Sequence, residues 1–126
     1  EEIMKYKATI DNNKEKLIGT QKYKLTLKKA QLPQTKAFWT INVLQMDKQI
    51  YENAKGKYGI GSKSKGLKFN KDGSLTIYLQ VEPPKGLETN WVPLPTENFE
   101  LVFKVYTPGE MVYSGEWAPP AIENVK

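Results

Sequence analysis

Few side chains of this 126-residue chain could do catalytic or metal-binding chemistry, because the sequence contains neither cysteine nor histidine. Disulfides, thiol nucleophiles, Cys/His zinc sites and Ser-His-Asp triads are therefore excluded. Carboxylates remain, and two of them about 5 to 9.5 Å apart can hydrolyse a glycosidic bond. Four glutamates in the C-terminal half are candidates for such a pair: Glu97, Glu100, Glu110 and Glu116. The sequence brings no two of them together, so we assign no catalytic residue and keep an enzyme using carboxylates or Lys, such as a carbohydrate-active hydrolase, as the alternative function.

A glycine-rich stretch over residues 59–66 is similar to a phosphate-binding loop only in composition. A Walker loop needs Lys and then Ser or Thr after its last glycine, whereas Leu67 and Lys68 follow here. A dinucleotide fingerprint that begins at the first glycine of the stretch needs another glycine where Ser64 stands. We therefore interpret this stretch as a structural loop or a generic anion contact.

The dipeptide Asp72-Gly73 has two interpretations. A calcium loop needs several acids at alternating positions, and Asp72 is the only one here. A hairpin turn needs a residue that accepts positive φ, which glycine does. We therefore predict a hairpin turn at this position, and we expect no bound metal and no organic cofactor.

Three tryptophans carry the largest side chains of the chain: Trp39, Trp91 and Trp117. An exposed tryptophan can stack on a sugar ring or anchor a partner, whereas a buried one fills the core. Trp91 is the best surface candidate, because prolines restrict its loop at residues 90–95 and so reduce the entropy lost on binding. We predict a ligand or partner surface formed by Asn90 and Trp91 with Tyr58 and Ser62. The alternative is that Trp91 is a core residue and both loops only close the fold.

Alternating apolar and polar residues predict the strands that must position these side chains. Four strands with one buried face are expected at residues 4–10, 22–28, 75–81 and 99–105. Residues 38–45 are apolar on both sides, as in a central strand, and residues 47–55 are the only helical candidate. Prolines, which cannot donate to a central ladder, cluster between or after these strands. The pattern predicts one all-β domain over residues 1–126, a sandwich or a barrel.

Charge is distributed unevenly along the chain. All 19 basic residues are lysine, and the net charge is +5. Residues 1–71 hold 16 lysines against 6 acids, whereas residues 72–126 hold 3 lysines against 8 acids. Base recognition in nucleic acids favours arginine, which is absent. We therefore expect a lysine-coated surface without specific nucleic-acid binding, although an electrostatic binder of anionic polymers stays open. Charges also interrupt every apolar run, so no segment is expected to insert into a membrane.

Ordered motifs carry a resemblance to a known family. They are Phe38-Trp39-Thr40, Tyr58-Gly59-Ile60-Gly61-Ser62, Asp72-Gly73-Ser74-Leu75-Thr76-Ile77-Tyr78-Leu79-Gln80, Asn90-Trp91-Val92-Pro93-Leu94-Pro95, and Tyr106-x-Pro108 followed by Gly115-x-Trp117-x-Pro119-Pro120. In this order and spacing, residues 38–125 resemble the family called domain of unknown function 1214, and residues 17–33 match it more weakly. The chain departs from the family at Lys104, where arginine is usual.

The resemblance implies a jelly-roll-like antiparallel β-sandwich, mostly bacterial and extracytoplasmic (periplasmic, secreted or membrane-anchored). It implies no assigned activity or catalytic residue. In the family this domain follows a second β domain or stands alone behind an anchor or signal, and a start at Glu1 without Met is compatible with a removed leader or preceding domain. We therefore expect a non-catalytic binding or assembly domain whose partner is a second β domain, a subunit of a homo-oligomer or a glycan-like ligand.

Overall fold

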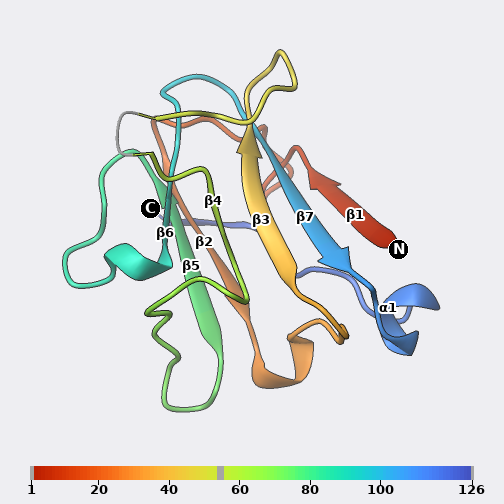
Figure 1. Cartoon of the computed structure of the whole chain (residues 1–126). Helices are drawn as coiled ribbons and strands as arrows, with labels where there is room; N and C mark the ends of the chain where they lie inside the picture. The colour runs from red at the N-terminus through yellow and green to blue at the C-terminus, as the bar shows by residue number, and fades with distance from the viewer. Residues whose placement is uncertain (1, 54–55, 126) are drawn as a thin grey trace.

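Two four-stranded sheets pack face to face in the computed structural model, which describes residues 2–53 and 56–125 (Figure 1). The first sheet has the strand order β1 (Ile3–Ala8), β7 (Glu100–Tyr106), β3 (Trp39–Leu44) and β4 (Gly59–Gly61). The second has the order β6 (Trp91–Pro93), β5 (Leu75–Gln80), β2 (Lys22–Leu27) and β8 (Glu123–Val125). Short helical turns complete the described elements: Lys29–Gln31, Glu88–Asn90 and the four-residue helix α1 (Glu110–Tyr113). The predicted β-sandwich is confirmed.

The core lies between the two sheets and is filled by every second residue of the strands. Leu25 of β2 stands opposite Ile77 of β5, and Ile41 of β3 stands opposite Phe103 of β7. All four side chains are at most 2% exposed, whereas Lys24 faces outward. All five strands predicted from alternation or apolar runs are present within two residues of their predicted bounds, and β3 is a central strand as expected.

The predicted hairpin turn before β5 is also confirmed. Gly73 has a φ of +86°, and its N–H donates to the carbonyl of Asn70 at 2.9 Å. The Asp72 carboxylate accepts the backbone N–H of Ser74 at 3.0 Å and its hydroxyl at 2.6 Å. These bonds favour the ionised carboxylate and lower the pKa of Asp72. The Asp72 carboxylate thus stabilises the turn in which it lies.

The helix predicted over residues 47–55 is wrong for residues 47–53, and residues 54–55 lie outside the described part of the chain. The Asp47 carboxylate accepts the N–H of Gln49 at 2.9 Å, and Lys48 has a φ of 71°. Leu44 then bridges Ile50 as an antiparallel partner. Aspartate that bonds the backbone two residues ahead favours a turn over a helix, which explains the difference.

Two segments that the sequence analysis treated as loops are short edge strands. β4 pairs with β3, and a Cβ atom at Gly61 would lie 2.4 Å from the Trp39 carbonyl oxygen, so glycine permits this close approach. β6 runs parallel to β5, which corrects the expectation of a purely antiparallel sandwich. The parallel direction follows from the crossover at residues 81–90, and Pro93 is tolerated because β6 is an edge strand.

The two open sides of the sandwich differ. On one side the edge strands β4 and β6 lie in contact. On the other side the edge strands are β1 and β8. There the segment leading to β8 contacts the β1 side through the ring contact between Tyr6 and Trp117 and through a hydrogen bond of 2.8 Å from the Asn12 N–H to the Ile122 carbonyl. β8 itself adds a bond of 3.0 Å from the Asn124 N–H to the Asn12 side chain.

Candidate functional site

Asn90 is 1% exposed, and its carboxamide bonds to backbone groups. Its Nδ2 donates to the carbonyls of Lys68 at 2.8 Å and Thr76 at 2.9 Å, and its Oδ1 accepts the Lys68 N–H at 2.9 Å. The side chain therefore holds the segment before the hairpin turn against β5. These bonds use both N–H groups of the amide, so no donor is left for a ligand in this arrangement.

Trp91 is 4% exposed and lies outside the main core cluster, on the outer face of its sheet beside Tyr78. Its indole N–H donates to the Gln80 carbonyl at 2.8 Å. The Lys57 ammonium lies 5.9 Å from the ring centre and also donates to the Glu88 carbonyl at 2.8 Å. Partial burial lowers the pKa of Lys57. The ring is therefore covered by a lysine, and any ligand would have to displace that lysine.

Tyr58 and Ser62 lie at the two ends of β4. Tyr58 is 51% exposed, and its carbonyl accepts an amide N–H of Asn42 at 2.8 Å. Ser62 exchanges hydrogen bonds with Trp39, whose N–H donates to the Ser62 hydroxyl at 3.0 Å. Lys57, which precedes Tyr58, contacts the Trp91 ring, so the start of β4 lies near Trp91. Ser62 lies at the opposite end of the strand. A shared binding surface of these residues with Asn90 and Trp91 stays a prediction.

Glu100, the buried member of the four candidate carboxylates, is an ion-pair residue at the start of β7. It is 7% exposed and lies 2.9 Å from the Lys48 ammonium and 3.6 Å from the Lys7 ammonium. The hydrogen bond from Lys48 is the main cause that lowers the pKa of Glu100. The other three are exposed and lie in loops or in α1: Glu97, Glu110 and Glu116. Within the ranges 2–53 and 56–125, no three acids are grouped so as to hold a metal ion.

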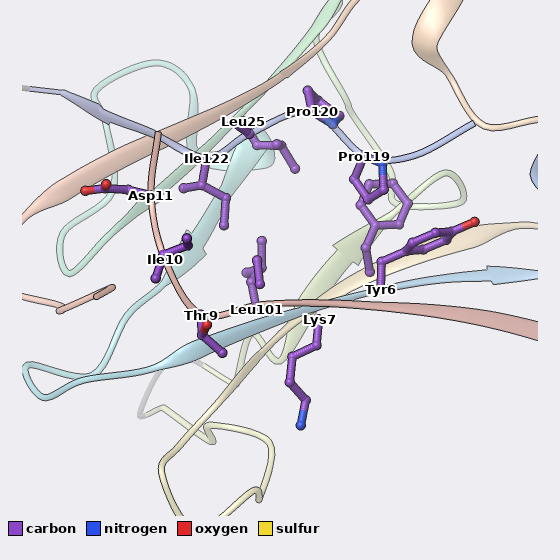
Figure 2. Close-up of a pocket in the computed structure, with 13 residues that line it drawn as sticks. Tyr6, Lys7, Thr9, Ile10, Asp11, Leu25, Leu101, Pro119, Pro120 and Ile122 are labelled. Carbon is purple, nitrogen blue, oxygen red and sulfur yellow. The ribbon is translucent and has the colours of Figure 1, made fainter. Parts of the chain in front are cut away.

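A groove lies on the open side of the sandwich, and sequence reasoning did not find it. It has a volume of about 610 Å³ and is drawn in Figure 2. One wall consists of six consecutive residues, 6–11, and the other of residues 119–122. The floor is formed by core side chains of β2 and β7: Leu25, Leu101 and Phe103. Its two walls become neighbours only when the sheets pack, so no local sequence signal could have revealed it.

The groove is mainly apolar. Figure 2 shows Leu25, Ile122 and Pro119 facing Leu101 across it, whereas the Lys7 side chain points away. The buried Asp11 carboxylate at one end accepts the N–H groups of Asn13 and Glu15. A hollow of this size lies within the range of roughly 300 to 1,000 Å³ typical of ligand pockets. Its chemistry is suited to binding apolar groups.

Tyr6 closes the other end of the groove. Its ring lies edge-on to Trp117 with 5.3 Å between the ring centres and an interplanar angle of 77°. The hydroxyl is buried and has no hydrogen-bond partner among the described residues. Burial raises the pKa of Tyr6. The end of the groove thus contains an unsatisfied polar atom, whose removal should not weaken the fold.

The backbone edge of β1 borders the groove and pairs with no strand of the described chain except β7. The Thr107 N–H donates to the Glu2 carbonyl at 2.8 Å, and the register places these two residues opposite each other. Hydrogen-bonded and non-bonded pairs alternate along an antiparallel ladder. Met4, Tyr6 and Ala8 therefore bond to β7, while the backbone groups of Ile3, Lys5 and Lys7 point towards the free edge.

These features define a β-sandwich domain with an apolar groove beside an unpaired edge strand. The chain belongs to the family described as protein of unknown function (DUF1214), whose model matches residues 2–110. This match confirms the resemblance inferred from the ordered motifs. The chain matches none of the curated proteins with which it was compared.

Two solved structures are similar to the chain. The VPA0106 protein from Vibrio parahaemolyticus is 27% identical with a TM-score of 0.86, over 99% of this chain and 31% of that one. An uncharacterised protein from Burkholderia cenocepacia is 19% identical with a TM-score of 0.60, over 98% of this chain and 29% of that one, and at this identity it shows the fold alone. The chain thus spans less than a third of the length of either protein.

Proposed function

We propose that this domain is a non-catalytic binding and assembly module that accepts an extended segment of another domain at the free edge of β1. The observation that carries the proposal is that three consecutive residues of β1, 6–8, line the groove together with residues 9–11, which follow the strand. A strand that showed only its inner face would contribute every second residue, so the edge itself borders the hollow. An added strand would gain backbone hydrogen bonds along the edge and place alternate side chains in the groove.

The partner that we propose is a second domain of the same, longer protein. Support comes from the Vibrio protein, in which the matching unit is 31% of the chain. A tethered segment binds at a high effective concentration, so a modest edge affinity is sufficient. A second copy of this chain is disfavoured, because antiparallel pairing of two β1 edges would bring their lysines, Lys5 and Lys7, opposite one another.

The proposal includes the jelly-roll-like winding and the extracytoplasmic location implied by the family resemblance. The winding is supported by β7, which inserts between β1 and β3 and thereby joins distant parts of the chain. The parallel pair of β5 and β6 departs from an ideal jelly roll. No helix within the described residues is long and apolar enough to cross a membrane. The location rests on the resemblance alone.

Selection of random decapeptides displayed on phage against the immobilised domain tests strand addition. Enriched peptides should bind wild type with a measurable Kd and should lose binding to Lys7→Pro. Proline at residue 7 removes an N–H that points to the free edge, so the ladder to β7 should survive. Lys7→Ala is the matched control, since it also removes the ion pair with Glu100 but keeps the N–H.

The outcome that supports the proposal is binding to wild type and Lys7→Ala but not to Lys7→Pro. No enrichment of any peptide contradicts strand addition, and so does equal binding to all three proteins. Circular dichroism of Lys7→Pro must match wild type for the comparison to count. If it does not, Lys5→Pro with Lys5→Ala provides the same test without touching the ion pair.

A further inference from the structure

Lys5 of β1 and Lys104 of β7 stand directly opposite each other on the outer face of the first sheet. Like charges at directly opposed positions destabilise a sheet. Neither lysine has an ion pair within residues 2–53 and 56–125. Across β7 from Lys104 stands Thr40, whose hydroxyl is uncharged. This part of the outer face therefore carries positive charge that the described residues do not balance.

The one acid on the described strands of this sheet already has partners. Glu100 lies at the start of β7, where it contacts both Lys7 and Lys48. It stands about 13 Å along the strand from Lys104, given a rise of about 3.3 Å per residue. The unbalanced charge is therefore concentrated beside the free edge of β1.

A strand added at this edge would divide its side chains between two different environments. Residues on its outer face would stand beside Lys5 and Lys7, because side chains of neighbouring strands lie on the same face at paired positions. Residues on its inner face would point towards the groove and its apolar walls, Ile122 and Pro119 among them. The alternation of a strand then requires one residue type for each face.

We infer that the segment accepted by β1 alternates acidic and apolar residues, with its carboxylates beside Lys5 and Lys7 and its apolar side chains in the groove; the charge of Lys104, one strand further in, adds to the attraction. This inference rests on the proposed strand addition and specifies its ligand. Charge complementarity selects both the segment and the side that each of its faces turns to. A shift of the segment by one residue would place its carboxylates in the apolar groove and its apolar groups beside the lysines. Only registers that differ by an even number of residues therefore allow binding.

The probes for the test are peptides selected on wild type as described above, together with derivatives in which every Asp or Glu is replaced by its amide. Selected peptides should carry acids at every second position. Their amide derivatives should bind about three- to tenfold more weakly at low salt, the range expected for two exposed ion pairs. The difference should shrink in 0.5 M salt, because exposed charges are screened.

Protein variants locate the effect. Lys5→Gln/Lys104→Gln should reduce the advantage of the acidic peptide and leave its amide derivative unchanged. Lys22→Gln, on the outer face of the second sheet, is the control and should keep the full advantage. Two outcomes overturn this inference and leave strand addition intact. In the first, the selected peptides lose binding to Lys7→Pro but carry no acids; in the second, their amide derivatives bind as tightly as the acidic peptides. Failure to select any peptide overturns strand addition itself.

Discussion

The Lys57 ammonium covers the Trp91 ring at 5.9 Å from its centre and is held there by a hydrogen bond to the Glu88 carbonyl. One side chain therefore joins the loop before β4 to the segment before β6. This contact lies on the side of the sandwich opposite the groove, where the edge strands β4 and β6 are in contact. The two sides thus differ: on one the edge strands contact each other, and the other borders an unpaired strand.

Replacement of Trp91 by alanine should destabilise the domain strongly. The side chain is 4% exposed and its indole N–H donates to the Gln80 carbonyl, so truncation removes a buried ring and one hydrogen bond. The expected cost is about 3–5 kcal/mol of the free energy of unfolding, measured by urea melts. Lys57→Ala, which removes only the covering lysine, should cost less than about 1 kcal/mol. A stable Trp91→Ala protein would show that the ring does not support the fold.

The strands could be predicted because their alternation is local. Tyr23, Leu25 and Leu27 alternate with Lys22, Lys24 and Thr26, and burial follows that order in β2. The short strands could not, since three-residue segments such as Gly59–Gly61 show no period and form a strand only because β3 lies beside them. The helix expected after Asp47 does not form, because the Asp47 carboxylate accepts the backbone N–H of Gln49 and so stabilises a turn in place of a helix.

Tyr6→Phe should leave the domain equally stable or make it more stable by up to about 1 kcal/mol. A buried polar group without a partner costs desolvation free energy, and phenylalanine keeps the ring that contacts Trp117. Tyr6→Ala, which removes this ring contact as well, should lose stability. Thermal unfolding of wild type and of both variants measures these differences in stability. A marked loss of stability in Tyr6→Phe would mean that the hydroxyl has a partner, such as a bound water.

Acid should weaken the domain partly through Glu100. Its pKa is lowered from the ordinary value of 4.5, chiefly by the hydrogen bond from Lys48. A lowered pKa in the folded state means that the contribution of Glu100 is complete above pH 4.5 and is lost as the pH falls through the folded-state value. The difference in unfolding free energy between wild type and Glu100→Gln should therefore shrink between pH 5 and pH 3. A constant difference over that range would disprove the role of the ion pair.

Binding to nucleic acid or other anionic polymers should be weak and sensitive to salt. The lysines do not form one surface, because Lys5 and Lys7 lie on the outer face of one sheet and Lys22 and Lys24 on that of the other. A site of about three phosphate contacts loses about 40-fold in affinity between 50 and 200 mM salt. Fluorescence anisotropy with labelled oligonucleotides measures this. Sub-micromolar, sequence-selective binding at about 200 mM salt would refute the expectation.

In the candidate site, too, local sequence motifs could be predicted, whereas contacts between distant parts of the chain could not. The motif around Asn90 and Trp91 is visible in the sequence, but burial reveals that both side chains bond to backbone within the fold. The groove joins residues 6–11 to residues 119–122, more than a hundred positions apart in the chain. Only the order of strands in the two sheets makes β1 an edge, and the order arises from tertiary packing.

Amide hydrogen exchange of β1, followed by NMR, tests the open edge most directly. In the domain alone, the N–H groups of Met4 and Tyr6 should exchange slowly, since they bond to β7, and those of Lys5 and Lys7 should exchange fast. A bound peptide selected as above should slow Lys5 and Lys7 as well. Protection of Lys5 and Lys7 in the free domain, or continued fast exchange with the peptide bound, would contradict strand addition at β1.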